Sequence, residues 1–229
     1  MKAAVLRELG KAPRFEEFAE PTAGKDEAVV RVRAASLKPI DKQLASGSHY
    51  ASPRELPVVC GTDGVGELED GTRVFFGGPK RPYGAMAERT VVPPRAFCFP
   101  GPSVIDDDTA AALPNTGVSA WLSLGHRAKL APGETALILG ATGVTGQLAV
   151  QIAKVLGAKR VIGAGRNERV LGRLHELGAD ATIQLDQLGD SLKDAFARRE
   201  MQGSTWLSTT CGGVLRRRCL RRLPGRNLR

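Results

Sequence analysis

The chain has 229 residues, 42% of them hydrophobic, and 27 glycines, as expected for one or two globular domains. No stretch approaches the ~18 consecutive apolar residues of a membrane span. Charge at Arg7 and Glu8 interrupts any signal-peptide core, so we expect a cytoplasmic protein with no membrane partner. The net charge of +9 is uneven, because eight arginines and one glutamate from Arg199 onward supply +7 of it. The net charge of the residues before Arg199 therefore does not indicate an acidic partner such as nucleic acid.

Residues 1–114 have the composition of β structure. Strand patterns cover residues 1–6 and 28–35, and a hairpin with an Asp-Gly turn is expected over residues 64–76. Another strand is expected over residues 88–93. Many short strands separated by glycine and proline predict a small barrel or sandwich.

Residues 115–198 change to alternating strands and helices. A helical segment over residues 111–130, with a break near Pro114, precedes this region. The expected order is then strand 135–140, helix 147–158, strand 160–165, helix 167–178, strand 181–185 and helix 190–199. This order predicts a parallel doubly wound sheet.

A glycine loop, Gly140-Ala141-Thr142-Gly143-Val144-Thr145-Gly146, lies between the first of these strands and its helix. Gly140 permits a tight turn, Gly143 a close backbone approach, and Gly146 close packing of the helix on the strand. The spacing is GxxGxxG, but its place between a buried strand and a long helix is that of a dinucleotide-binding fingerprint. A purely structural turn is the alternative.

The end of the second strand indicates which dinucleotide binds. A ribose-binding acid is expected roughly 20 residues after the loop, but Gly165 occupies that place. Arg166, with Arg169, offers a guanidinium to a 2′-phosphate instead, although both arginines are also consistent with a solvated helix start. We therefore expect NADPH as cofactor, with NADH as the less favoured choice.

The chain resembles the medium-chain dehydrogenase/reductase superfamily, and within it the zinc-independent quinone oxidoreductase branch. The residues that carry the resemblance are MKAAVL, LPVVCGTDGVGEL, YGAMAERTVVP, AALPNTGVSAWLSL and GATGVTGQLAVQIAKVLGA. The resemblance implies a GroES-like barrel domain (1–114) followed by an incomplete Rossmann domain (115–198). It also implies hydride transfer from NADPH to a quinone or α,β-unsaturated carbonyl, a small-molecule substrate.

The resemblance also implies site residues. Zinc-binding members have a Cys three residues before an Asp and a His-Glu pair after a glycine, whereas this chain has Lys38 before Asp41 and Thr62-Asp63. We therefore expect no metal. Lys38, which could polarise a carbonyl, and Tyr50, which could supply a proton, are the candidate catalytic residues. A surface lysine and a tyrosine that only lines the cleft are the alternatives. The candidate cofactor-binding residues are Ser119, Gly140, Ala141, Thr142, Gly143, Val144, Thr145, Gly146, Gly165, Arg166 and Asn167.

Residues 199–229 do not continue the Rossmann pattern. Read one base out of frame, the codons from Ser204 permit V-D-V-V-I-D-Y-L-W, the composition of a fourth buried strand. We therefore hypothesise a slipped frame near residues 199–203, giving an aberrant basic tail. A nucleic-acid-binding arm and a disordered extension are the alternatives.

Together these features predict an NADPH-dependent, zinc-free oxidoreductase, impaired in this truncated chain and able to form a homo-oligomer. A non-catalytic NADPH-binding redox sensor is the alternative function. Nucleic-acid binding through the tail is a less favoured one.

Overall fold

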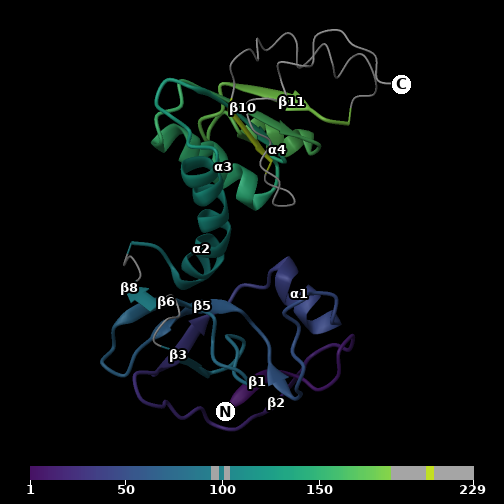
Figure 1. Ribbon diagram of the computed structural model, residues 1–229, viewed down its shortest axis with the longest axis vertical. Helices are drawn as coiled ribbons and strands as arrows, with labels where there is room; N and C mark the ends of the chain where they lie inside the picture. Colours follow the sequence, from purple (N-terminus) through teal and green to yellow (C-terminus); the bar gives the residue numbers. More distant parts are fainter. Residues whose placement is uncertain (94–97, 101–103, 187–204, 209–229) are drawn as a thin grey trace. The chain divides into compact units, whose positions relative to one another are not determined.

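The structure, a computed structural model, describes residues 1–93, 98–100, 104–186 and 205–208. The chain divides into two compact units, Met1–Pro114 and Asn115–Arg229 (Figure 1). The limit between them falls where the sequence changes from strand-rich to helix-rich.

The first unit contains two antiparallel sheets. One has the order β2-β1-β4 and the other the order β7-β3-β5-β6-β8. The strands are β1 (Lys2–Leu6), β2 (Arg14–Glu17), β3 (Ala28–Ala34), β4 (Val58–Val59), β5 (Asp63–Glu67), β6 (Arg73–Gly77), β7 (Arg89–Val92) and β8 (Cys98–Pro100).

Alternation of side chains orients the larger sheet. On β3, Val30 is fully buried with Val74 and Phe76 of β6, whereas Arg31 and Arg33 point to solvent. The hairpin expected over residues 64–76 is confirmed as β5 and β6, which pair from Asp63 opposite Gly77 to Glu67 opposite Arg73.

The short helix α1 (Pro39–Ser46) was not expected from the sequence. Pro39 suits its first turn because a proline there gives up no helical hydrogen bond. The backbone N–H of Lys38, the residue at the N-cap, donates to Oδ2 of Asp41 at 2.8 Å. Gly47 ends the helix with a φ of 79°. The fold thereby places Lys38 and Asp41 together at the helix start.

The helix α2 (Asp107–Trp121) crosses the limit between the units and is followed by a π-helical turn, η1 (Leu122–Arg127). The break expected near Pro114 is wrong, because α2 continues through this proline. A proline removes its own N–H donor and its ring crowds the carbonyl four residues earlier, but a helix can continue on both sides of it at a cost in stability.

The second unit is built on a parallel sheet with the order β11-β10-β9-β12. Its elements are β9 (Thr135–Leu139), α3 (Val144–Val155), β10 (Arg160–Gly165), α4 (Glu168–Arg173), β11 (Ala181–Gln184) and β12 (Thr205–Ser208). The order is that of one half of a doubly wound sheet, with the first strand next to the fourth.

The central strand β9 is buried on both faces, as its unbroken apolar sequence predicts. Ile138 packs on the side of α3, with Val150 and Ala153, while Leu137 packs on the other side with Ile162. Figure 1 shows α3 lying along the sheet. This packing fixes the start of α3 at the carboxyl end of β9.

The segment 199–229 differs in one respect from the sequence-based expectation. Thr205–Ser208 forms β12, which pairs in parallel with β9 from Thr205 opposite Ala136 to Ser208 opposite Leu139. The expectation that no fourth strand is present is therefore wrong. The open edge of β9 offers backbone N–H and C=O groups to any extended segment, whatever its side chains. The helix expected over residues 190–199 and the rest of the tail lie outside the described residues.

Candidate cofactor-binding site

The glycine loop begins directly after β9. Gly140 has a φ of 76°, a conformation that favours glycine, and its carbonyl accepts a hydrogen bond from the Gly143 N–H at 3.0 Å. A Cβ on Gly146 would lie 2.2 Å from the Gly140 oxygen and 2.6 Å from the Ala141 Cα. Gly140 therefore makes the turn, and Gly146 allows α3 to pack against it, as the sequence predicts.

The start of α3 is open. Gly143 is the N-cap, with extended backbone and no side chain that caps the helix, and the Gln147 N–H makes the first helical bond to its carbonyl at 2.9 Å. Helix geometry leaves the N–H groups of residues 144–146 without helical acceptors. A Cβ on Gly143 would meet only the Gly140 oxygen, at 3.5 Å, so the chain leaves space at the N-cap, next to these donors. The uncapped helix start suits a phosphate group.

The end of β10 lies next to this loop. The Ala141 N–H donates to the Ala164 carbonyl at 2.9 Å, which brings Thr142 beside Gly165. Arg166 follows on the surface, and its guanidinium has no ion-pair partner among the described residues. An exposed arginine therefore follows directly after Gly165, the residue that lies against the glycine loop.

Asn167 has a structural task. Its Oδ1 accepts a hydrogen bond from the Val170 N–H at 3.2 Å and so caps α4. Gln184, which the sequence analysis missed, donates from Nε2 to the Arg166 carbonyl at 2.7 Å. Only the pairing of β10 with β11 brings Gln184 to this place, so no local pattern in the sequence indicates it.

Lys38 lies in a buried ionic cluster of the first unit. Its ammonium donates to Asp63 Oδ1 at 2.5 Å and to the Ser36 carbonyl at 3.1 Å. Lys38, Asp41 and Asp63 are all less than 9% exposed, and Asp41 Oδ1 and Asp63 Oδ2 have no hydrogen-bond partner among the described residues. Two of the three ammonium protons are thus engaged, and the third remains for another acceptor.

Cys60 is influenced by the same cluster. Burial, together with the negative charge of Asp41, raises the pKa of the Cys60 thiol. A thiol with a raised pKa is a poor nucleophile and a poor metal ligand at neutral pH.

Tyr50 and Ser119, the other two candidate residues, lie in different units. The Tyr50 side chain is 96% exposed, and its ring stacks on His49 with 4.3 Å between centroids. Ser119 lies on α2, where its hydroxyl donates to the Asn115 carbonyl at 3.1 Å.

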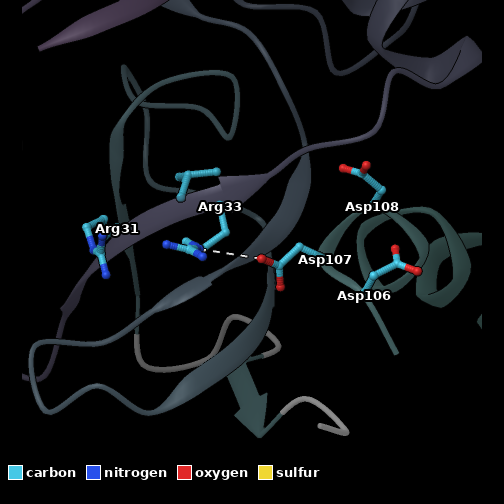
Figure 2. Close-up of a pocket in the computed structure, with 6 residues that line it drawn as sticks. Arg31, Arg33, Asp106, Asp107 and Asp108 are labelled. Carbon is cyan, nitrogen blue, oxygen red and sulfur yellow. Dashed lines mark hydrogen bonds and ion pairs between the residues drawn. The ribbon is translucent and has the colours of Figure 1, made fainter. Parts of the chain in front are cut away.

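A shallow pocket of about 500 Å³ in the first unit is lined by charged side chains (Figure 2). Asp107 contacts Arg73 at 2.8 Å and Arg33 at 3.4 Å. Asp106 accepts a hydrogen bond from the Thr109 N–H at 2.7 Å, which caps α2 and holds the pKa of the Asp106 carboxyl below its ordinary value. Arg33, Asp106 and Asp107 are thus engaged in interactions within the first unit, so we assign the pocket a structural role.

Comparison with known proteins gives a consistent group of relatives. The chain is 33% identical to a quinone oxidoreductase-like protein 2 homolog of Nematostella vectensis, over 96% of this chain and 62% of that protein. It is 31% identical to a chloroplastic NADPH-dependent alkenal/one oxidoreductase of Arabidopsis thaliana, over 76% of this chain and 48% of that protein. The solved quinone oxidoreductase of Thermus thermophilus matches with a TM-score of 0.72 and 34% identity, over 80% of this chain and 60% of that one. No family model matches the chain.

The fold is a GroES-like domain followed by an incomplete Rossmann domain. The homologues and structural neighbours of the chain are members of the medium-chain dehydrogenase/reductase superfamily. Within this superfamily, the chain's homologues and structural neighbours are quinone oxidoreductase-like proteins, which confirms the resemblance found in the sequence. The chain spans between about half and two thirds of the length of the first relatives, 62%, 48% and 50%.

The names of some similar proteins refer to zinc. A zinc-type alcohol dehydrogenase-like protein of Staphylococcus aureus is 27% identical over 77% of this chain and 56% of that protein. Within the described part of this chain, no three His, Cys, Asp or Glu side chains gather as a metal site. Nor is any helix there long and apolar enough to span a membrane.

Proposed function

We propose that the chain binds NADPH at the glycine loop and reduces a quinone or an α,β-unsaturated carbonyl compound. The observation that carries this proposal is the uncapped start of α3, which follows a buried parallel strand through the glycine loop. The loop residue Thr142 lies against Gly165, which directly precedes the exposed Arg166. The names of the quinone and alkenal reductases among its relatives support the same reaction class.

The residues fit a phosphorylated dinucleotide. The N–H groups of residues 144–146 would hold the pyrophosphate, with Gly143 leaving space for it. Arg166 would pair with the 2′-phosphate, because no carboxylate is available at Gly165 for an unmodified ribose. Ser119, Thr142 and Asn167 complete the set, with Asn167 acting through the cap of α4. When bound, the nicotinamide supplies the hydride.

Lys38 is the proposed group that polarises the substrate carbonyl. Asp63 and the Ser36 carbonyl orient its ammonium, and the remaining proton can donate to an oxygen that becomes negative during reduction. Tyr50, whose hydroxyl has no hydrogen-bond partner among the described residues, is the proposed proton donor.

We propose that no metal takes part. In place of a ligand set, the chain has an ammonium at Lys38, which cannot bind a cation and whose charge opposes one. The raised pKa of the Cys60 thiol also disfavours metal binding. A cytoplasmic location is part of the proposal, to be tested by cell fractionation, since one relative is chloroplastic by name.

Oxidation of NADPH by the purified chain, measured at 340 nm with 1,4-benzoquinone and with but-3-en-2-one, tests this function. Turnover that is lost in Lys38→Met/Asp63→Asn, the variant that leaves no unpaired buried charge, while NADPH still binds would support the proposal. NADPH binding without turnover of either acceptor would favour the redox sensor. Affinity for DNA or RNA that falls with salt, without NADPH binding, would favour the basic arm.

A further inference from the structure

Thr142 of the glycine loop lies directly against Gly165 at the end of β10. A Cβ on Gly165 would lie 2.4 Å from Cγ2, 2.8 Å from Oγ1 and 3.1 Å from Cβ of Thr142. Gly165 does not have a positive φ, so its backbone conformation does not require glycine. The Thr142 side chain is therefore what excludes any larger residue at position 165.

Neither backbone can easily move away. The Gly165 carbonyl accepts a hydrogen bond from the Leu185 N–H at 2.8 Å, which ties it to β11. On the other side, the Ala141 N–H donates to the Ala164 carbonyl at 2.9 Å and holds the loop against β10. Separating Thr142 from Gly165 would break these bonds, each of which contributes to stability.

Rotation of the Thr142 side chain does not relieve the clash either. Threonine carries two heavy atoms on Cβ, which fill two of the three staggered positions. Both positions near Gly165 are filled now. In either of the other two rotamers of Thr142, one of these two positions loses its heavy atom but the second position keeps one. Every rotamer of Thr142 therefore places a heavy atom too close to a Cβ on residue 165.

We propose that Thr142 determines the choice of dinucleotide by excluding an acidic side chain at position 165. The end of the second strand is where an aspartate or glutamate holds the ribose of an unphosphorylated dinucleotide. With Thr142 present this acid cannot be accommodated, and the space beside Arg166 remains free for a 2′-phosphate. This proposal rests on the proposed NADPH binding at the same loop.

The test combines Gly165→Asp with changes at Thr142. Gly165→Asp alone should lower the melting temperature by roughly 5 °C and weaken the binding of both dinucleotides, because the added side chain overpacks the loop. Adding Thr142→Ala removes Cγ2 and Oγ1 and should restore most of the stability. The double variant should bind NADH at least about tenfold more tightly than the unmodified chain does, because the new carboxylate adds one charged hydrogen bond. It should bind NADPH more weakly than the unmodified chain.

Thr142→Val is the matched control, because valine keeps both branches. The Thr142→Val/Gly165→Asp variant should behave as Gly165→Asp alone. If Gly165→Asp does not fold, the milder Gly165→Ala, compared by urea unfolding with and without Thr142→Ala, measures the same coupling. The proposal would be overturned if Gly165→Asp were as stable as the unmodified chain. It would also be overturned if adding Thr142→Ala did not raise the stability of the Gly165 variant.

Different results would refute the proposed function and the proposed role of Thr142. If the unmodified chain binds neither dinucleotide, the function is wrong, whereas the unfolding measurements still decide whether Thr142 excludes a side chain at position 165. If NADPH binds but Thr142→Ala/Gly165→Asp gains no affinity for NADH, the specificity role of Thr142 is wrong.

Discussion

The ammonium of Lys38 lies 2.5 Å from a carboxylate oxygen of Asp63, and side-chain exposures of 8% and 5% show that both groups are buried. A buried ion pair is strongly destabilised when one partner is removed, because the other charge is left without compensation. The pair therefore fixes the orientation of Lys38, which is the buried residue of the two catalytic candidates, Lys38 and Tyr50.

Lys38→Met should reduce the free energy of unfolding by about 3–5 kcal/mol, since Asp63 then keeps a buried charge without a partner. The Lys38→Met/Asp63→Asn variant removes both charges and should recover much of this loss. Urea unfolding followed by circular dichroism measures both. A single variant as stable as the unmodified chain, or a double variant less stable than the single one, would contradict this account.

Gly146→Ala should destabilise the second unit by about 1–3 kcal/mol, the usual cost of overpacking. The added methyl group would lie 2.2 Å from the Gly140 oxygen, which the turn holds in place. Gly143→Ala is the control, because its methyl group would lie 3.5 Å from that same oxygen. The control should keep its unfolding midpoint but bind NADPH more weakly. Equal unfolding midpoints for the two variants would show that Gly146 is not required for packing.

The cap of α2 should make stability depend on pH. The Thr109 N–H holds the pKa of Asp106 below the ordinary value of 3.8, so the carboxylate stabilises the folded state above that value. This stabilisation is lost as the pH falls through the lowered folded pKa. The difference in melting temperature between the unmodified chain and Asp106→Ala should therefore be full at pH 6 and shrink below about pH 4. A difference that grows toward acid pH would mean that Asp106 is not the cap.

Much of the fold was predictable because local patterns carry it. The apolar run of β9, the Asp-Gly turn between β5 and β6, and the glycine loop each depend on neighbouring residues. The cluster of Lys38, Asp41 and Asp63 was not predictable, because it joins the start of α1 to β5 through tertiary packing. The contact of Thr142 with Gly165 also arises only when β9 and β10 pair.

The frame hypothesis for residues 199–229 stays a prediction. The position of β12, at Thr205–Ser208 beside β9, coincides with the start of the apolar run that the shifted frame permits. The coding DNA around codons 199–203 should show a slipped frame whose continuation encodes an apolar strand, for which V-D-V-V-I-D-Y-L-W is one permitted sequence. An early stop codon in the shifted frame would end this hypothesis.

The central claim is that the glycine loop and Arg166 form a site for NADPH. Fluorescence titration of the purified chain and of Arg166→Ala with NADPH and NADH tests it most directly. Arg173→Ala, a change at another surface arginine, is the control. We expect NADPH to bind about tenfold or more tightly than NADH, and Arg166→Ala, unlike Arg173→Ala, to remove this difference. Equal affinities for the two dinucleotides, or no binding of either, would contradict the account.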